Sequence, residues 1–456
     1  MNRLFISAAH KSSGKTTLCI GLAAALRARG EVVQPFKKGP DYIDPLWLGL
    51  AAGRPCYNLD PYLSGAQELR AELARRMQGA TLGLVEGNKG LYDGLDLHGS
   101  NSNAAMAALL GTPVVLVIDA RGMTRGIAPL ILGYQAFDRN IRIAGVILNQ
   151  LGGSRHEAKL RAVIAHYTGV PVLGAVQHDE RMTIVERHLG LVPSNEAQGA
   201  RARVEEIAAR IASQVDLEAL LAVARSAPAL EAKAAPVTVR ASGTPLRLGI
   251  ARDAAFGFYY PGDLDALRAA GAELVPFDAL RDKRLPSVDA LFIGGGFPET
   301  HMDALAANAE LRAAVRDAIE AGMPAYAECG GLMYLARTLE WNGRRAEMAG
   351  VLPADIVMHA RPVGRGYVHL RETGRGPWPA RAALIRAHEF HYSSVENLAP
   401  GLAFAYDVER GHGIDGRHDG IVYKNLLASY AHLRDVAEHH WAARFVEFAA
   451  TAATHA

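Results

Sequence analysis

Short apolar runs alternate with longer stretches of helical spacing through the first half of this 456-residue chain, and few folds accommodate such a pattern. The apolar runs, which predict buried strands, lie at residues 4–7, 32–36, 82–86, 113–119, 143–149 and 172–176. Stretches rich in Ala, Leu and Arg, such as Thr16–Arg29, separate them and predict helices. Because strands that alternate with helices form a mainly parallel sheet covered on both faces, we expect an α/β fold.

The alternation stops at residues 226–245 and then resumes. This segment is rich in Ala and Pro and has no periodicity, which is typical of a linker. Further strands are predicted at 246–251, 273–277, 290–293 and 325–327, with helices at 264–270 and 302–321. We therefore expect one α/β domain at 1–225 and a second at 246–456.

A phosphate-binding loop is predicted where the first strand ends. Gly14, Lys15 and Thr16 complete the pattern G-x4-G-K-[ST], Thr17 continues into the helix, and Ala9 replaces the first glycine of the pattern. The glycine lets backbone N–H groups turn towards phosphate, the lysine reaches the β- and γ-phosphates, and the Thr16 hydroxyl can bind Mg²⁺. The helix N-terminus adds a favourable dipole, so we expect ATP to bind here.

Three carboxylates are expected beside this loop. Glu86 ends the strand at 82–86, and Asp41 and Asp44 follow the second strand. Because ligands gather at the carboxyl ends of parallel strands, we expect these three side chains and Thr16 to hold Mg²⁺. The alternative is a solvated loop in which the two aspartates form ion pairs.

A second reactive site is predicted around Cys329. The sequence AYAECGGLM has the form strand, sharp turn, helix, and its small residues allow a strained turn that presents a nucleophile. Gly294, Gly295 and Gly296 end another strand, and their N–H groups are candidates for an oxyanion hole. A cysteine nucleophile needs a base, and His432 near the C-terminus is the candidate.

Composition excludes several classes of protein. The net charge is +2, from 49 basic and 47 acidic residues, so nucleic acid or an anionic membrane is not an expected partner. No run reaches the ~20 apolar residues of a membrane-spanning helix, and the N-terminus lacks the apolar run of a signal peptide. Three widely spaced cysteines argue against disulfides, so we expect a cytoplasmic protein.

Taken together and in this order, the two sites resemble the cobyrinate a,c-diamide synthase family, which comprises glutamine-dependent tetrapyrrole amidotransferases. The resemblance covers nearly the whole chain, through the stretches QPFKKGPDYIDP, NLDPY, VEG…GLYDG, TPVVLVIDA, GVILNQ, ERHLGLVPS, ARDAAFGFYYPGDL, DKRLPSVDALFIGGGFPE, AECGGLMYL, GVLP, HEFHYS and ASYAHL. It implies a dethiobiotin-synthetase-like, ATP-dependent amidoligase domain followed by a class I glutaminase domain. Cys329 would attack glutamine with His432 as its base, and the ammonia released would attack an acyl phosphate that ATP forms on the substrate.

The substrate implied by the resemblance is a polycarboxylate tetrapyrrole, whose acid groups need cations at the rim of the site. The sequence offers Lys37, Lys38 and Lys89 in the first domain. In the second domain, Arg361, Arg365 and His391 are further candidates.

Two departures from the family pattern bear on the site. Asn88-Lys89 stands where relatives have an apolar pair, which keeps siroheme or a sirohydrochlorin derivative open as the acceptor instead of cobyrinate or hydrogenobyrinate. Arg434 stands two residues after the histidine, where many glutaminases carry a Glu, so no third triad member is assigned.

Two alternatives of other classes remain. One is a ParA-like regulatory ATPase, although His10 stands where such proteins have a second signature lysine and they do not need a Cys329 domain. The other is an ATP-dependent ligase fused to an inactive binding module. A homodimer is left open.

Overall fold

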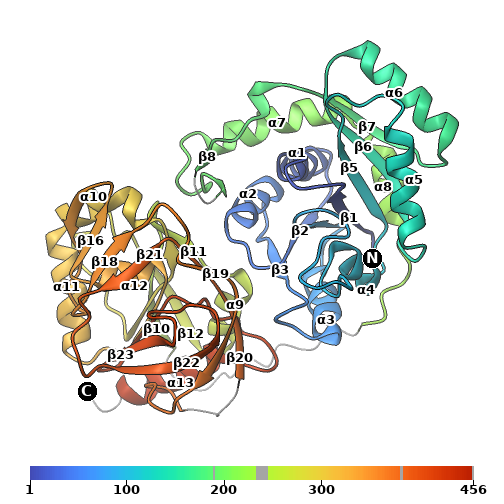
Figure 1. Ribbon diagram of the computed structural model, residues 1–456. Helices are drawn as coiled ribbons and strands as arrows, with labels where there is room; N and C mark the ends of the chain where they lie inside the picture. The colour runs from blue at the N-terminus through green and yellow to red at the C-terminus, as the bar shows by residue number, and fades with distance from the viewer. Residues whose placement is uncertain (188–189, 233–244, 380–383, 454–456) are drawn as a thin grey trace. The chain divides into compact units, whose positions relative to one another are not determined.

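The computed structural model describes residues 1–187, 190–232, 245–379 and 384–453. The chain divides into two compact units, Met1–Pro236 and Val237–Ala456 (Figure 1). Most of the expected linker, at 226–245, lies outside the described residues, which stop at 232 and resume at 245. Among the described helices, none combines the length and the apolar character that crossing a membrane requires.

The described part of the first unit contains a seven-stranded parallel sheet in the order β3-β2-β4-β1-β5-β6-β7. Its strands are β1 (Arg3–Ala8), β2 (Val33–Lys38), β3 (Tyr57–Leu59), β4 (Leu82–Glu86), β5 (Val114–Asp119), β6 (Ile143–Leu151) and β7 (Val172–Gln177). Strands β2, β4 and β1 are neighbours in this sheet, and the loops that follow them begin at the same edge of the sheet, where the strands end. The predicted phosphate and metal ligands lie at this edge.

Helices cover this sheet on both faces (Figure 1). On one face, α3 (Ala66–Arg76), α4 (Asn103–Leu110), α5 (Ile127–Phe137) and α6 (Ser154–Tyr167) share an apolar core with the strands. Elsewhere, α1 (Lys15–Ala28) packs against α2 (Ile43–Ala52) and α7 (Ala200–Gln214), and α8 (Leu217–Arg225) contacts β1 and β7. The 3-10 turn η1 (Glu180–Met182) and the hairpin β8 (Glu186–Arg187) and β9 (Gly190–Leu191) precede α7.

The second unit contains a nine-stranded mixed sheet in its described residues, in the order β12-β10-β13-β15-β24-β23-β22-β19-β20. The first five strands are parallel: β12 (Ala272–Phe277), β10 (Leu246–Ala251), β13 (Ala290–Ile293), β15 (Ala325–Glu328) and β24 (Leu426–Ser429). The other four are antiparallel neighbours: β23 (His418–Tyr423), β22 (Ala403–Arg410), β19 (Gly364–Glu372) and β20 (Leu384–His391). The alternation in the sequence predicts four of the five parallel strands, and it predicts neither β24 nor the antiparallel half.

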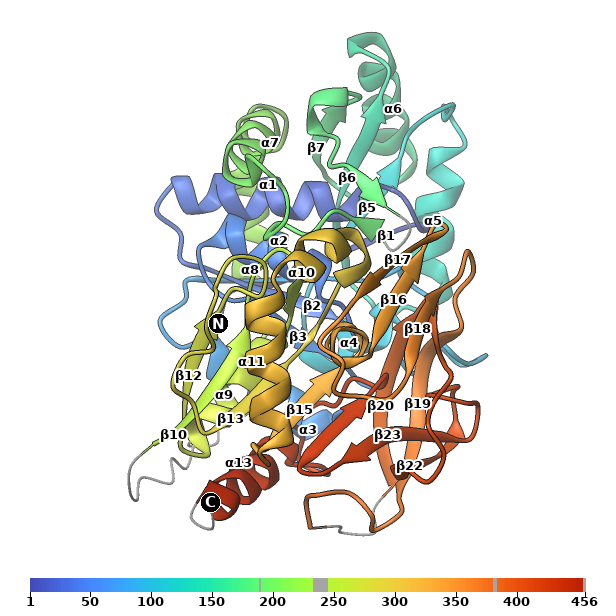
Figure 2. The ribbon, with the colours of Figure 1, turned by 90° about the vertical axis from the view of Figure 1, so that its left-hand side faces the viewer.

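Two apolar cores lie on the two faces of this sheet. One includes α10 (Met302–Ala307), α11 (Ala309–Glu320) and α12 (Gly330–Leu335), and Figure 2 shows α11 running across the parallel strands. The other includes α9 (Pro261–Ala269) and α13 (Trp441–Ala453). The helix expected at 302–321 is interrupted at Asn308, whose side-chain amide donates to the carbonyls of Ala279 and Asp282 at 3.0 and 2.8 Å.

Smaller sheets complete the second unit. β11 (Phe256–Phe258) pairs with β14 (Gly295–Gly296). A four-stranded sheet joins β17 (Arg344–Glu347), β16 (Thr338–Trp341), β18 (Asp355–Met358) and β21 (Ser393–Glu396). The 3-10 turn η2 (Pro298–His301) leads into α10.

Candidate functional sites

The phosphate loop joins β1 to α1 in the first unit. Gly14 has φ +79°, a left-handed conformation that favours glycine, and α1 begins at Lys15. The amide of Asn149 at the end of β6 donates to the Ser13 carbonyl at 2.8 Å, and a Cβ on Gly14 would lie 2.3 Å from its nitrogen. The loop therefore needs glycine both for its backbone angle and for this contact.

Lys15 and Thr17 lie in the first turn of α1, where backbone N–H groups are available to phosphate. The Lys15 ammonium is buried and donates to the Lys89 carbonyl at 2.7 Å, and burial lowers its pKa. The sequence pattern thus produces the strand, loop and helix that a P-loop requires. The Lys15 side chain is held by its hydrogen bond to the loop that follows β4.

The Thr16 hydroxyl lies between two of the three predicted carboxylates. Its Oγ1 is 2.7 Å from Glu86 Oε1 and 3.1 Å from Asp44 Oδ2. The Lys37 ammonium lies among the same acids, 2.9 Å from Glu86 Oε1, 2.5 Å from Asp44 Oδ2 and 3.7 Å from Asp41 Oδ2. Burial alone would lower the pKa of Lys37, but the charges of Asp44 and Glu86 raise it well above its usual value.

The three acids are held in different ways. Burial raises the pKa of Glu86, whereas the Lys37 charge outweighs burial and lowers the pKa of Asp44. Asp41 caps α2, because its Oδ1 accepts from the N–H groups of Ile43 and Asp44 at 3.0 and 3.1 Å. Burial and the Asp44 charge raise the pKa of Asp41 to about 7.

This cluster fits a hard cation in its chemistry. Mg²⁺ prefers oxygen ligands, and the buried Glu86 Oε2 has no hydrogen-bond partner among the described residues. Within the described residues no group of three or more His, Cys, Asp or Glu side chains forms a metal site by itself. A metal here would use the Thr16 hydroxyl with Asp44 and Glu86, next to the Lys37 ammonium.

The predicted acceptor lysines differ in exposure. Strand β2 continues two residues beyond the expected end, so Lys37 and Lys38 are buried strand residues, each 3% exposed, and not rim groups. The Lys38 ammonium donates to Asn88 Oδ1 at 3.1 Å, and burial lowers its pKa to about 8. Lys89 is exposed and has φ +41°.

Asn103, which the sequence analysis did not select, supports the loop that carries Lys89. Its buried amide nitrogen donates to the carbonyls of Asn88 and Gly90 and to Ser7 Oγ, and its Oδ1 accepts from the Asn88 N–H at 3.2 Å. A single Asn at the start of a helix gives no distinctive pattern in the sequence, because its role depends on strands far away in the chain.

In the second unit, Cys329 stands at a strained turn between β15 and α12. Its φ of +47° and ψ of −101° are unusual for a non-glycine residue, and its N–H donates to the Ser429 carbonyl at 2.8 Å. A Cβ on Gly331 would lie 2.0 Å from the Ile293 carbonyl oxygen, so glycine is required for α12 to approach β13. The structure thus contains the sharp strand–helix turn that the small residues predict.

The three glycines after β13 have different surroundings. The Gly294 N–H donates to the Tyr259 hydroxyl at 3.0 Å and so is not available as an oxyanion donor, which corrects the expectation for this residue. A Cβ on Gly295 would lie 2.7 Å from His432 Cε1, so the absence of a side chain makes room for the imidazole. The Gly296 nitrogen lies beside the first residue of α12, where a Cβ on Gly330 would approach it to 2.9 Å.

His432 is buried beside Cys329. Its Nδ1 lies 3.4 Å from Glu328 Oε2, and its ring stacks on His388 with centroids 4.9 Å apart. Burial lowers the pKa of His432, but hydrogen bonds to Cys329 and Glu328 outweigh this effect and raise it to about 10. The structure therefore brings together the predicted cysteine and histidine and adds a glutamate that the sequence analysis did not select.

The three further acceptor candidates of the second unit differ in their exposure to solvent. Arg361 and Arg365 are exposed, and the Arg365 guanidinium lies 5.5 Å from the Phe390 ring centroid. His391 is buried and stacks on Tyr430 with centroids 3.7 Å apart. His391 is therefore not a rim group, because neighbouring rings and strands enclose it.

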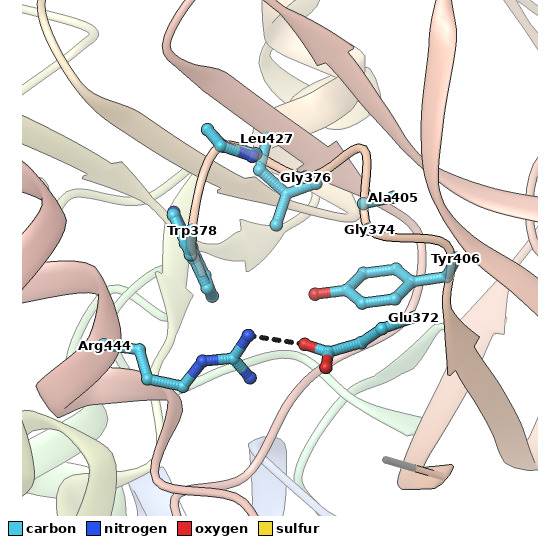
Figure 3. Close-up of a pocket in the computed structure, with 9 residues that line it drawn as sticks. Glu372, Gly374, Gly376, Trp378, Ala405, Tyr406, Leu427 and Arg444 are labelled. Atoms are coloured by element: carbon cyan, nitrogen blue, oxygen red, sulfur yellow. Dashed lines mark hydrogen bonds and ion pairs between the residues drawn. The ribbon is translucent and has the colours of Figure 1, made fainter. Parts of the chain in front are cut away.

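A small pocket lies apart from these residues, between β19, β22 and α13 (Figure 3). Arg444 reaches Glu372 there at 2.5 Å, with Trp378 and Tyr406 beside them. Its volume of about 10 Å³ leaves room for about one water molecule. None of its lining residues is among the candidate catalytic residues, so we assign it no part in the reaction.

Comparison with known proteins assigns each unit to a known domain family. Residues 5–192 match the CobQ/CobB/MinD/ParA nucleotide binding domain, and residues 247–437 match the CobB/CobQ-like glutamine amidotransferase domain. A cobyrinate a,c-diamide synthase of Magnetococcus marinus is 50% identical over 98% of this chain and 97% of its own length. The chain belongs to the cobyrinate a,c-diamide synthase family.

Further members of the family align over the same extent. The synthase of Methanosarcina acetivorans is 41% identical over 98% of this chain and 95% of its own, and that of Syntrophotalea carbinolica is 40% identical over 98% of both. The resemblance found in the sequence motifs is thus confirmed, as is the fold of a nucleotide-binding domain followed by an amidotransferase domain. Membership makes this chain a glutamine-dependent amidating ligase.

Proposed function

We propose that this protein amidates the a- and c-side-chain carboxylates of cobyrinate, or of hydrogenobyrinate, at the expense of ATP and glutamine. The observation that carries the proposal is the strained Cys329, hydrogen-bonded to His432, in a chain that also presents Lys15 and Thr16 at a phosphate loop. The names of the relatives support cobyrinate as the acceptor.

In the second unit, the Cys329 thiolate attacks the carboxamide carbon of glutamine. His432 takes the thiol proton and returns it to the departing ammonia, which leaves a thioester that water hydrolyses to glutamate. The N–H groups of Gly295 and Gly296 are the proposed donors to the oxyanion. The positive φ of Cys329 supports this role, because strain of this kind is characteristic of residues that present a nucleophile.

In the first unit, a substrate carboxylate attacks the γ-phosphate of ATP, ADP leaves, and the carboxylate becomes an acyl phosphate. Gly14, Lys15, Thr16 and Thr17 are proposed to bind the phosphates, and Mg²⁺ would neutralise their charge when bound by Thr16, Asp44 and Glu86. Ammonia then displaces phosphate and forms the amide. Activation is necessary because a carboxylate is a poor acyl donor.

The carboxylates around the metal site have further proposed roles. Asp41 caps α2 and so orients the Asp44 side chain, and Lys37 balances the charge of the acids. For the acceptor we propose Lys89, which is exposed, whereas Lys38 is buried and its ammonium is held by Asn88. Asn88-Lys89 keeps siroheme or a sirohydrochlorin derivative open as the second candidate acceptor, because the Lys89 cation can pair with a peripheral carboxylate of either kind of tetrapyrrole.

The test is amidation by the purified chain of cobyrinate, hydrogenobyrinate and siroheme in parallel, with products identified by mass spectrometry. We expect cobyrinate or hydrogenobyrinate to be converted with matching consumption of glutamine and ATP, and ¹⁸O from a labelled carboxylate to appear in phosphate. Conversion of siroheme alone would reassign the acceptor. ATP hydrolysis without amidation would favour a regulatory ATPase. Amidation that proceeds with ammonia but not with glutamine would favour a ligase with an inactive second module.

A further inference from the structure

Glu328 is the last residue of β15 and directly precedes the cysteine. Its carboxylate is 3% exposed, and three groups contact it. Oε1 accepts from the Tyr326 hydroxyl at 2.6 Å and from the Leu433 N–H at 3.0 Å, while Oε2 lies 3.4 Å from His432 Nδ1. Two fixed donors on one oxygen therefore aim the other oxygen at the imidazole.

The position of this carboxylate decides which ring nitrogen faces the thiol. With Nδ1 directed at Glu328, Nε2 is the nitrogen that serves Cys329, to which His432 is hydrogen-bonded. His388 covers one ring face, and Gly295 packs against the edge that carries Cε1. The titratable groups that face the ring are thus Cys329, Glu328 and His388.

Arg434, which stands where many glutaminases place a Glu, does not compete for this role. Its guanidinium lies over the Tyr260 ring at 4.0 Å from the centroid, and its Nη1 is 3.7 Å from Asp263 Oδ1. A guanidinium has only donors, so it cannot accept a hydrogen bond from the Nδ1–H of His432.

We propose that Glu328 is the positioning residue of the glutaminase site, so that the triad is Cys329–His432–Glu328. This inference rests on the proposed roles of the cysteine and the histidine. The carboxylate accepts a hydrogen bond from Nδ1–H, which makes Nε2 the nitrogen that takes the thiol proton. The negative charge also stabilises the imidazolium that forms when that proton is taken.

The decisive variant is Glu328→Gln. Its Oε1 can still accept from Tyr326 and Leu433, but its amide NH₂ then faces His432 Nδ1 and offers a donor where an acceptor is needed. We expect kcat for glutamine hydrolysis to fall by about 10²- to 10⁴-fold, with the KM for glutamine little changed. The alkaline limb of the pH profile should move to lower pH, because the imidazolium loses its carboxylate partner.

Two further readouts separate positioning from simple structural support. Alkylation of Cys329 by iodoacetamide at pH 7 should be slower in Glu328→Gln, since the thiolate–imidazolium pair is less stable. Glu328→Asp should restore part of the rate of glutamine hydrolysis and part of the rate of alkylation. The matched control is Glu372→Gln, which removes a buried carboxylate paired with Arg444 in the same unit. It should lower thermal stability and leave glutaminase kcat and alkylation unchanged.

The outcomes distinguish this inference from the function on which it rests. Glutamine hydrolysis that survives Cys329→Ala overturns the proposed function itself. If Cys329→Ala is inactive with glutamine while a folded Glu328→Gln keeps the parental kcat, pH profile and alkylation rate, the triad assignment is wrong. ¹⁵N NMR of histidine-labelled parent protein, with His432 assigned from His432→Gln and titrated to the pH at which its ring becomes neutral, tests the same point without a Glu328 variant: the neutral ring should keep its proton on Nδ1, and the opposite tautomer overturns the proposal.

Discussion

At the scale of single residues, Lys37 and Lys15 show how two neighbouring ammonium groups are used differently. Lys37 is surrounded by Asp41, Asp44 and Glu86, which compensate for the cost of burying its charge. Lys15 donates to one carbonyl, that of Lys89, and burial lowers its pKa. A phosphate at this loop would therefore meet Lys15 as its cation, with Lys37 already neutralised by acids.

Lys15→Ala should suppress amidation with glutamine and with ammonia alike, because acyl phosphate forms before ammonia attacks. We expect a loss of at least about 10²-fold in kcat/KM, as stabilisation of charge on the transferred phosphoryl group is lost. Steady-state amidation with each nitrogen source measures this, and thermal unfolding checks that the variant is folded. Full ammonia-dependent activity would contradict the phosphate-loop assignment.

Lys89→Met should weaken binding of the acceptor or change the preference between cobyrinate and siroheme. The lost cation faces a peripheral carboxylate in our proposal, which is worth about 1–3 kcal/mol if the pair is partly shielded from water. Comparison of KM for both acceptors measures the effect, and glutamine hydrolysis should be spared. Lys159→Met, a change in the helix α6 of the same unit, serves as a control for loss of one charge. Kinetics identical to the parent for both acceptors would remove Lys89 from the site.

At the scale of elements, the contact between β13 and α12 holds the cysteine turn in its strained form. Gly331 approaches the backbone of Ile293 so closely that no side chain fits, and backbone atoms do not move aside as a flexible side chain does. The helix thus packs against the strand through glycine, and Cys329 remains at positive φ because both neighbouring elements are fixed.

Gly331→Ala should destabilise the second unit by about 1–3 kcal/mol, the usual range for forcing an extra carbon into a packed interior. Glutamine hydrolysis should also fall, because the turn that presents Cys329 shifts. Denaturant unfolding and glutaminase assays measure the two effects. Gly126→Ala is the matched control: its φ of −60° is helical, and no atom in the described part of the chain lies within 4 Å of the added Cβ, so the stability of this variant should equal or exceed the parent's. Parental stability and activity in Gly331→Ala would contradict the close packing.

At the scale of the whole molecule, the two candidate sites lie in two compact units of one chain. The chemistry divides in the same way in our proposal, since one unit releases ammonia and the other activates the carboxylate. Assays with glutamine and with ammonia should therefore distinguish variants that lose ammonia release from variants that lose activation of the carboxylate.

Cys329→Ala should abolish amidation driven by glutamine and leave amidation driven by ammonium salts largely intact, because a single covalent route is removed. The ratio of the two rates, measured on the same preparation, is the readout. A folded variant that is equally inactive with both nitrogen sources would contradict this division between the units.

Much of the parallel architecture follows from local patterns. Strands β4, β10 and β13 begin and end where their apolar runs do, and α1 starts one residue before the predicted helix. The phosphate loop and the cysteine turn are likewise recognisable, because each is a contiguous motif in which glycine and a reactive residue stand at fixed spacing. Such features depend on backbone conformation within a few residues, and that information is present in the linear chain.

Tertiary structure decided what the linear pattern does not contain. The antiparallel half of the second sheet comes from strands of 6 to 9 residues that mix polar and apolar side chains, and their pairing depends on distant partners. Contacts across strands bury Lys37 and His391. Such contacts also direct the Gly294 N–H to the Tyr259 hydroxyl and place the Glu328 carboxylate beside His432. The sequence by itself therefore determined the two α/β units and their candidate site motifs, while the folded chain decided which charged groups are enclosed and which carboxylate faces His432. The physical reason is that hydrogen bonds and burial between residues far apart in the chain exist only after the sheets have formed.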